Sequence, residues 1–217
     1  MTTNFDERGI MKQQTEVRSR QVGPWQMNTY ALVSTATNES VLIDPGADPD
    51  ALTKMLAGTT PVAILLTHTH PDHVGALDEM LERLGVPLVA HHGPHLISLD
   101  KDTSLGDGDT FTFGDTTLHV YHAPGHIDDQ ICFQVAGENT IIVGDTIFEG
   151  GPGKTWSSEG FKQTIATLKN VVLQWPDDSI CYPGHGPSFR LGDIRQQVEG
   201  FVARDHGNFY GDAEWEQ

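Results

Sequence analysis

The chain has 217 residues and a formal net charge of −17, from 13 Lys plus Arg against 30 Asp plus Glu. This length suits one domain with a sizeable hydrophobic core. A composition of 37% hydrophobic and 20% charged residues, with 23 Gly and 12 Pro, excludes collagen-like, coiled-coil and disordered chains. Because so acidic a protein repels polyanions, nucleic acid is not expected as a partner.

No run of residues approaches the about 20 consecutive apolar positions of a membrane-spanning helix, and the start, MTTNFDERGI, lacks the apolar core of a signal peptide. We therefore predict a cytoplasmic protein that does not act at membranes. Residues 1–16 are polar and aperiodic, and they are expected to be a flexible segment before a single domain at 17–217. The two cysteines, Cys132 and Cys181, lie in apolar runs and are expected to be buried thiols.

The first half of the chain predicts three strands, a helix, a strand and a second helix, in the order 16–22, 29–33, 41–43, 48–56, 62–66 and 72–84. The run from Val62 to Leu66 is continuously apolar, as in a strand that is covered on both faces. The second helix keeps apolar residues three or four positions apart as far as Leu84, and Gly85 ends it.

The second half predicts five strands, a helix, a strand and a last helix, in the order 87–90, 110–113, 116–121, 130–135, 140–143, 158–173, 179–182 and 191–203. Each half thus passes from strands to a helix, a strand and a helix. This rough duplication predicts two mixed sheets packed together with helices outside, an α+β fold.

The strongest chemical signal is the segment His68-Thr69-His70-Pro71-Asp72-His73, between a predicted buried strand and a predicted helix. Three imidazoles and a carboxylate packed so densely are costly without a cation. Extended backbone sends His68 and His70 to the same side, whereas the turn into the helix re-aims Asp72 and His73. Two ligand sets with different directions predict two metal ions.

A two-metal site needs about six or seven donors with one shared anion, so further ligands must come from elsewhere in the chain. Three residues fit, because each follows a predicted strand directly: His126 in APGH, Asp145 in GDT and His185 in PGHG. Ligands on loops at the ends of strands are typical of sites built on a rigid sheet.

The ordered set HTHPDH, APGH, GDT and PGHG resembles the metallo-β-lactamase fold hydrolases, and within them the glyoxalase II-like (hydroxyacylglutathione hydrolase-like) branch, over about residues 17–204. The resemblance implies a four-layer αββα sandwich. It also implies one metal on His68, His70 and His126, a second on Asp72, His73 and His185, and Asp145 as the bridge between them.

The resemblance further implies a hydrolase for a small-molecule substrate, in which two divalent cations lower the pKa of a bridging water toward about 7 and deliver hydroxide to a carbonyl. Zinc is expected first, with iron or manganese as alternatives. Asp72 is expected also to orient the hydroxide. The turn Gly151-Pro152-Gly153-Lys154 is similar to one in which glyoxalase II-like enzymes contact the substrate carboxylate, so Lys154 is a candidate substrate-binding residue.

The sequence departs from this branch in several places. His126 is followed by Ile-Asp-Asp, no tyrosine stands two residues after His185, and the C-terminal helical domain that binds glutathione is expected to be missing. Thioesters are the first substrate candidates, followed by lactones and phosphoesters, because the same hydroxide attacks each of them.

Other functions stay open. A persulfide dioxygenase of the same fold would hold one iron on His68, His126 and Asp145, although the residues after Asp145 lack the pattern of those enzymes. β-Lactam hydrolysis is a minor interpretation, since two-zinc β-lactamases have cysteine where Asp145 stands. A binding module braced by metal is a third alternative.

Overall fold

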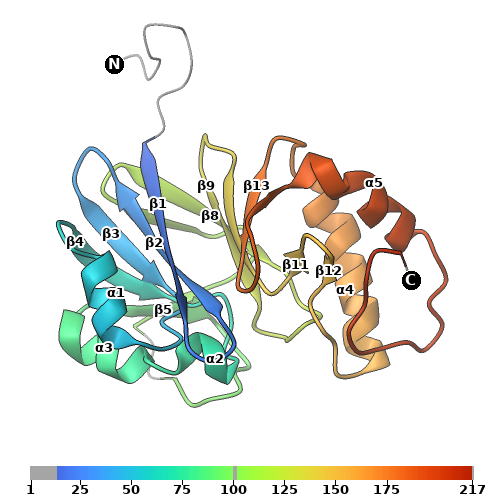
Figure 1. Ribbon diagram of the computed structural model, residues 1–217, viewed down its shortest axis with the longest axis horizontal. Helices are drawn as coiled ribbons and strands as arrows, with labels where there is room; N and C mark the ends of the chain where they lie inside the picture. The colour runs from blue at the N-terminus through green and yellow to red at the C-terminus, as the bar shows by residue number, and fades with distance from the viewer. Residues whose placement is uncertain (1–13, 100–101, 217) are drawn as a thin grey trace, which may run out of the picture.

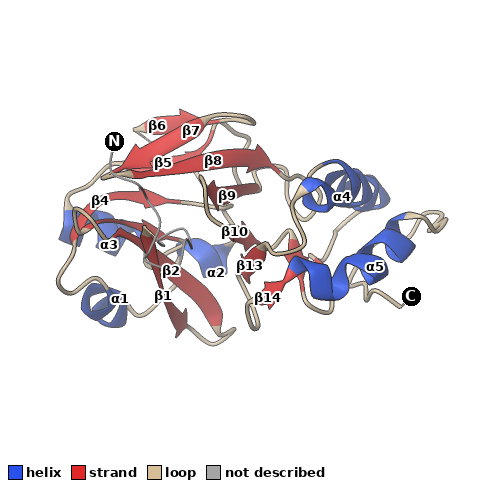
Figure 2. Cartoon of the chain, turned by 90° about the horizontal axis from the view of Figure 1, so that it is seen from above, coloured by secondary structure: helices blue, strands red, loops and turns tan. Residues whose placement is uncertain are grey.

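The computed structural model describes residues 14–99 and 102–216. Two six-stranded sheets face each other, with helices on both outer sides (Figures 1 and 2). The first sheet has the order β1-β2-β3-β4-β5-β6. Its strands are Thr15–Val22, Met27–Ser34, Glu39–Ile43, Thr60–Leu65, Leu88–His91 and Thr103–Leu105. The first three strands pair antiparallel, and β3 to β6 pair parallel.

The second sheet has the order β14-β13-β10-β9-β8-β7. In chain order its strands are β7 Thr110–Phe113, β8 Thr116–His122, β9 Ile131–Val135, β10 Thr140–Gly144, β13 Ile180–Pro183 and β14 Phe189–Arg190. They pair antiparallel except for β10 and β13, which are parallel. A small hairpin of β11 (Ile147–Phe148) and β12 (Gly151–Pro152) stands beside this sheet.

Parallel neighbours need crossover connections, and helices lie in those from β3 to β4, from β4 to β5 and from β10 to β13. Helices α1 (Pro49–Met55), α2 (Pro71–Val74) and α3 (Leu77–Leu84) belong to the first sheet, and α4 (Ser158–Asn170) and α5 (Leu191–Val202) belong to the second. A short 3-10 helix, Val172–Gln174, follows α4. Figures 1 and 2 show α1 and α3 at one end of the molecule and α4 and α5 at the other.

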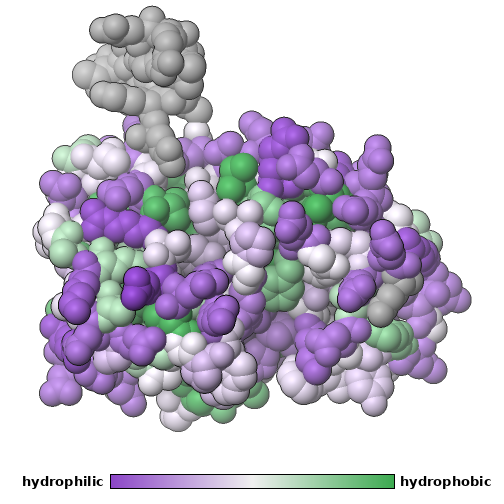
Figure 3. Space-filling view, viewed as in Figure 1, coloured by the Kyte–Doolittle hydropathy of each residue, from purple (hydrophilic) through white to green (hydrophobic). Residues whose placement is uncertain are grey.

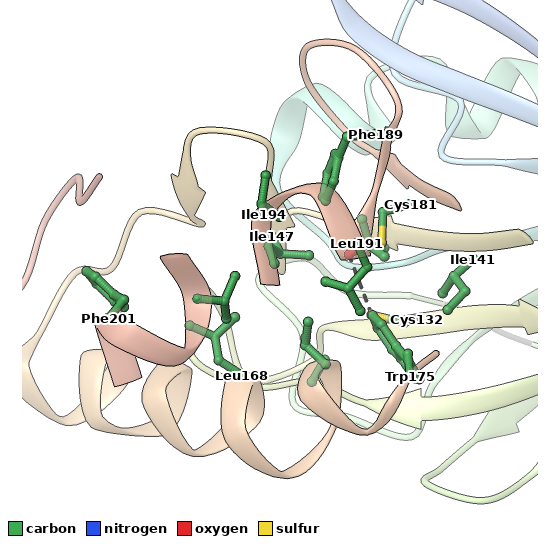
Figure 4. Close-up of a cluster of buried hydrophobic side chains, with 14 of the residues drawn as sticks. Cys132, Ile141, Ile147, Leu168, Trp175, Cys181, Phe189, Leu191, Ile194 and Phe201 are labelled. Carbon is green, nitrogen blue, oxygen red and sulfur yellow. Dashed lines mark hydrogen bonds between the residues drawn. The ribbon is translucent and has the colours of Figure 1, made fainter. Parts of the chain in front are cut away.

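Three buried apolar clusters hold these layers together, and burying such side chains contributes about 1.5–3 kcal/mol each. The middle cluster joins the inner faces of both sheets, through residues such as Leu32, Ile43, Val120 and Phe133. A second cluster lies between the first sheet and its helices. The third packs α4 and α5 on the second sheet; in Figure 4 Leu191 lies beside Cys132 and Trp175, and Leu168 and Phe201 lie further away along the helices.

This arrangement confirms the predicted αββα sandwich of two mixed sheets with outer helices. Both cysteines are free and buried, as expected. Among the described residues, no helix has the length and hydropathy that a membrane span requires. The face seen in Figure 3 is mostly hydrophilic. Residues 1–13 of the predicted flexible segment lie outside the described residues, whereas Thr15 and Glu16 belong to β1.

The predicted helix at 72–84 was wrong as one element, because it is split into α2 and α3. Gly75 lies against Gly46, where a Cβ would stand 2.4 Å from the Gly46 carbonyl oxygen. The Ala76 N–H donates to the Pro45 oxygen at 2.9 Å rather than to its own helix. This contact with a distant segment interrupts the helix, and no helical periodicity reports it.

Candidate metal centre

The loops that carry the candidate ligands lie at the ends of strands in both sheets. The segment His68–His73 follows β4 of the first sheet, whereas His126, Asp145 and His185 follow β8, β10 and β13 of the second. Because β10 and β13 are parallel neighbours, Asp145 and His185 leave the sheet side by side. At this edge the Ile131 N–H donates to the Thr67 oxygen at 2.8 Å, which joins the two sheets.

The structure brings the candidate ligands together in two groups of three. The donor atoms of His68, His70 and His126 all lie within 4.8 Å of one another. Those of Asp72, His73 and His185 form a second group of the same kind. These are the two sets that the resemblance implied, and each set contains residues from both sheets.

Asp145 lies between the two groups. Its Oδ2 is 3.6 Å from Nε2 of His126 and 3.7 Å from Nε2 of His185, one residue of each group. Its Oδ1 is 3.4 Å from Nε2 of His73. A carboxylate in this position can contact two cations at once, which is the geometry expected of a bridging ligand.

The outer nitrogens of four histidines are engaged in hydrogen bonds. Nδ1 of His73 donates to Asp44 at 2.9 Å, and Nδ1 of His126 donates to the Lys154 oxygen at 2.7 Å. Nδ1 of His185 donates to the Trp25 oxygen at 3.2 Å. Since the Thr67 hydroxyl gives its hydrogen to Asp44, it accepts from Nδ1 of His68 at 3.0 Å.

These contacts fix the tautomer of each ring. With the hydrogen held on Nδ1, the lone pair lies on Nε2, which in all four rings belongs to the cluster. His70 differs, because its Nδ1 lies 2.7 Å from Nε2 of His126. The arrangement therefore directs imidazole nitrogens from both groups toward a common space.

Several of these donor atoms are buried without a hydrogen-bond partner among the described residues. They include Nε2 of His68, Nε2 of His73 and Oδ1 of Asp145. A buried polar atom left unsatisfied costs about 1–3 kcal/mol, so three at one place are unfavourable unless something binds them. The residues present fit divalent cations, for which imidazole nitrogen and carboxylate oxygen are suitable ligands.

The electrostatics of the site favour neutral imidazoles in the first group. Burial lowers the pKa of His68 well below its usual value, lowers that of His70 to about 4, and also lowers that of His126. Such rings are unprotonated at neutral pH and are ready to bind a metal ion.

The electrostatics of the second group favour positive charge. Burial opposes protonation of His73, but the charge of Asp145 and the charge and hydrogen bond of Asp44 outweigh it and raise its pKa to about 10. Burial likewise opposes ionisation of Asp145, yet His73, His126 and His185 lower its pKa to about 2. The carboxylates thus stabilise positive charge between the two groups, which a bound cation also supplies.

Two residues that support the centre were missed by the sequence analysis. Asp44 follows β3, the parallel neighbour of β4, and its carboxylate accepts hydrogen bonds from the Thr67 N–H at 2.7 Å, the Thr67 hydroxyl at 2.6 Å and His73. Gly184 lies so close to the donors that a Cβ there would stand 2.2 Å from Oδ1 of Asp145.

Asp129 supports the same loop from the other side. Its buried carboxylate accepts from the Thr69 hydroxyl at 2.6 Å and from Nδ1 of His95 at 2.9 Å. Thr69 stands between two candidate ligands, so this pair fixes the loop. Asp129 belongs to the Ile-Asp-Asp segment that departs from the family pattern, and no local pattern indicates its contact with Thr69.

The remaining candidate, Lys154, lies on the wall of a cavity of about 590 Å³ that opens onto the centre. Its ammonium is 2.9 Å from Oδ2 of Asp212 and 5.1 Å from the ring centroid of Trp156. Trp25 and Trp156, which also line this cavity, are 66% and 64% exposed. The space beside the candidate ligands thus has aromatic walls and one ion pair.

The family model of the metallo-beta-lactamase superfamily matches residues 22–188. The chain belongs to this superfamily. It is 31% identical over 192 residues to the probable metallo-hydrolase YqgX of Bacillus subtilis (strain 168), covering 78% of this chain and 90% of that protein.

Two further proteins are similar. A hydroxyacylglutathione hydrolase of Bradyrhizobium sp. (strain BTAi1 / ATCC BAA-1182) is 32% identical over 157 residues, which are 72% of this chain but 61% of that enzyme. The crystal structure of TTHA1623 in a di-iron-bound form superposes with a TM-score of 0.69 at 29% identity, covering 82% of this chain and 97% of the other. The chain is thus similar to a hydroxyacylglutathione hydrolase, but it spans less than two thirds of that enzyme's length.

Proposed function

We propose that this protein is a binuclear metal-dependent hydrolase that cleaves a thioester or a related ester or lactone of a small molecule. The single observation that carries the proposal is the pair of three-residue donor groups with Asp145 between them, whose unsatisfied nitrogens and oxygen converge. The relatives support it, since one is a hydroxyacylglutathione hydrolase and a similar structure holds two irons.

In this proposal one metal is held by His68, His70 and His126 and the other by Asp72, His73 and His185, with Asp145 shared. When bound, the ions, most simply zinc but also iron or manganese, supply hydroxide at neutral pH and polarise the substrate carbonyl. No serine or cysteine nucleophile is required. The donor set suits these metals because it combines imidazole nitrogen with carboxylate oxygen.

The protein's own residues would position the reactants. The Asp72 carboxylate, 3.1 Å from Nε2 of His185, is half-buried and accepts hydrogen bonds, so it can orient the proton of the attacking water. Trp25 and Trp156 present apolar surface to the substrate beside the centre. Lys154 contributes N–H donors at the polar end of the same cavity.

Elemental analysis and a substrate panel test the proposal together. Protein purified without added metal is expected to hold two ions per chain, and metal-replete protein is expected to hydrolyse thioesters or lactones. Asp145→Asn should lower the metal content at both positions and abolish turnover. A single iron with oxygen uptake on a persulfide would favour the dioxygenase, and full metal content with normal turnover in Asp145→Asn would refute the bridge.

A further inference from the structure

The last described residues form a wall of the cavity beside the metal centre. The Thr155 N–H donates to the Gly211 oxygen at 3.0 Å, and the Trp215 N–H donates to the Gly150 oxygen at 3.2 Å. The indole N–H of Trp215 donates to the Glu149 oxygen at 2.8 Å, and its side chain is buried. Residues 211–216 are therefore fixed against the β11–β12 hairpin rather than extending into solvent.

The cavity that this wall borders is strongly acidic. A space of about 700 Å³ shares His126, Asp145 and His185 with the metal centre. Beyond the candidate ligands, four carboxylates line it, from Glu149, Asp212, Glu214 and Glu216. Lys154 is the one lysine or arginine among the described residues that line it. Such a wall attracts cations and repels anions.

The single ammonium in this cavity is already paired. Nζ of Lys154 lies 2.9 Å from Oδ2 of Asp212, which the anchored segment brings to that position. A substrate carboxylate that approached Lys154 would have to displace Asp212 and would meet the neighbouring acidic groups. The lysine keeps further N–H donors that a neutral carbonyl or hydroxyl oxygen can accept.

The adjoining cavity of about 590 Å³ shares Lys154 and Asp212 with the acidic one, and its aromatic groups agree with this charge pattern. Trp25 and Trp156 are exposed, and indole faces attract cations as well as apolar groups. Lys154 itself lies over the ring of Trp156. A leaving group that is apolar or carries an ammonium would find favourable contacts here.

We propose that this cavity selects carbonyl substrates whose leaving group carries no negative charge, and that Asp212 is the specificity-determining residue because it occupies Lys154. The inference rests on the proposed hydrolase function and names its substrate class. It places the chain apart from enzymes for anionic thioesters such as those of glutathione.

The first test varies charge alone. Three acetyl thioesters share one acyl group and differ in the thiol, which is thiocholine, N-acetylcysteamine or 3-mercaptopropionate. The metal-replete protein is expected to give the largest kcat/KM with the cationic thiol and the smallest with the anionic one. A preference for the anionic thioester would overturn the inference.

The variant Asp212→Asn tests whether Asp212 determines this charge preference. Removing one carboxylate near the surface should raise kcat/KM for the anionic thioester about fivefold, lower it for the cationic one by a similar factor, and change it least for the neutral one. The gain should disappear in Asp212→Asn combined with Lys154→Ala. Glu199→Gln, an exposed charge loss on α5, is the matched control. Equal changes for all three thioesters would mean that Asp212 only supports the loop.

Fluorescence quenching tests the charge of the cavity without turnover. Trp25 and Trp156 are exposed, whereas Trp175 and Trp215 are 3% exposed, so ionic quenchers report on the mouth. Caesium should quench the metal-loaded protein more strongly than iodide at equal ionic strength, and Asp212→Asn should increase quenching by iodide. If no thioester is cleaved, the proposed function fails, but the quenching measurement still reports the charge of the cavity. Equal quenching by both ions, unchanged in the variant, overturns the inference whatever the protein hydrolyses.

Discussion

Asp44→Asn should weaken both the fold and the metal centre. Asp44 is 1% exposed, and its two oxygens accept three hydrogen bonds, two from Thr67 and one from His73. An asparagine has one acceptor oxygen, so its NH₂ group must face a buried donor on one side. Losing a charge-assisted bond and leaving one donor unsatisfied should cost about 3 kcal/mol of unfolding free energy.

Urea unfolding in excess chelator measures this loss separately from metal binding, and competition with a chromophoric chelator measures the metal affinity. The affinity should fall about 10- to 100-fold, because Asp44 orients a candidate ligand. Asparagine is chosen because it tolerates the left-handed backbone at Asp44, where φ is 54°.

Asp48→Asn is the matched control. Asp48 has the same φ of 54°, but it is exposed, and its side chain accepts a hydrogen bond from the Gly23 N–H at 3.1 Å. Its substitution should change the unfolding free energy by less than about 0.5 kcal/mol. If Asp44→Asn unfolds like the control and binds metal as tightly as the unsubstituted protein, the supporting role assigned to Asp44 is wrong.

Two further predictions concern Gly184 and the cysteines. Gly184→Ala would place a Cβ against Asp145 and His73, so metal retained after dialysis should drop while far-ultraviolet circular dichroism stays unchanged; full retention would show that the loop yields easily. Burial raises the pKa of Cys132 to about 12 and raises that of Cys181 as well. A thiol reagent at pH 8 should therefore modify neither in the native protein and both in denaturant, and rapid native labelling would contradict this.

The sequence was most informative where local pattern and chemistry coincide. The apolar run before His68 predicted β4, and the histidines after it predicted a metal site, because both signals lie within one short segment. His126, Asp145 and His185 could be placed because each follows a strand. Their convergence depends on two sheets packing face to face, for which the family resemblance supplied the expectation.

The parts that were missed depend on contacts between distant segments. Asp44 has no distinctive local sequence, and its role follows from the parallel pairing of β3 with β4. The break before α3 depends on Gly46, about thirty residues earlier in the chain. Asp212 lies in an aperiodic segment after the last helix, so periodicity could not place it beside Lys154. Helix and strand propensities depend on residues that are close in the sequence, whereas these features depend on residues that are close only in the folded structure.

Each donor group contains residues from both sheets. A bound ion would therefore link the two halves of the sandwich through residues that are far apart along the chain. The loop of His68 belongs to one half, and Asp145 and His185 belong to the other. Amide hydrogens at this edge, such as that of Ile131, should then exchange in concert with metal release rather than with fraying of a single strand. Metal binding at this site would then stabilise the packing of the two halves against separation.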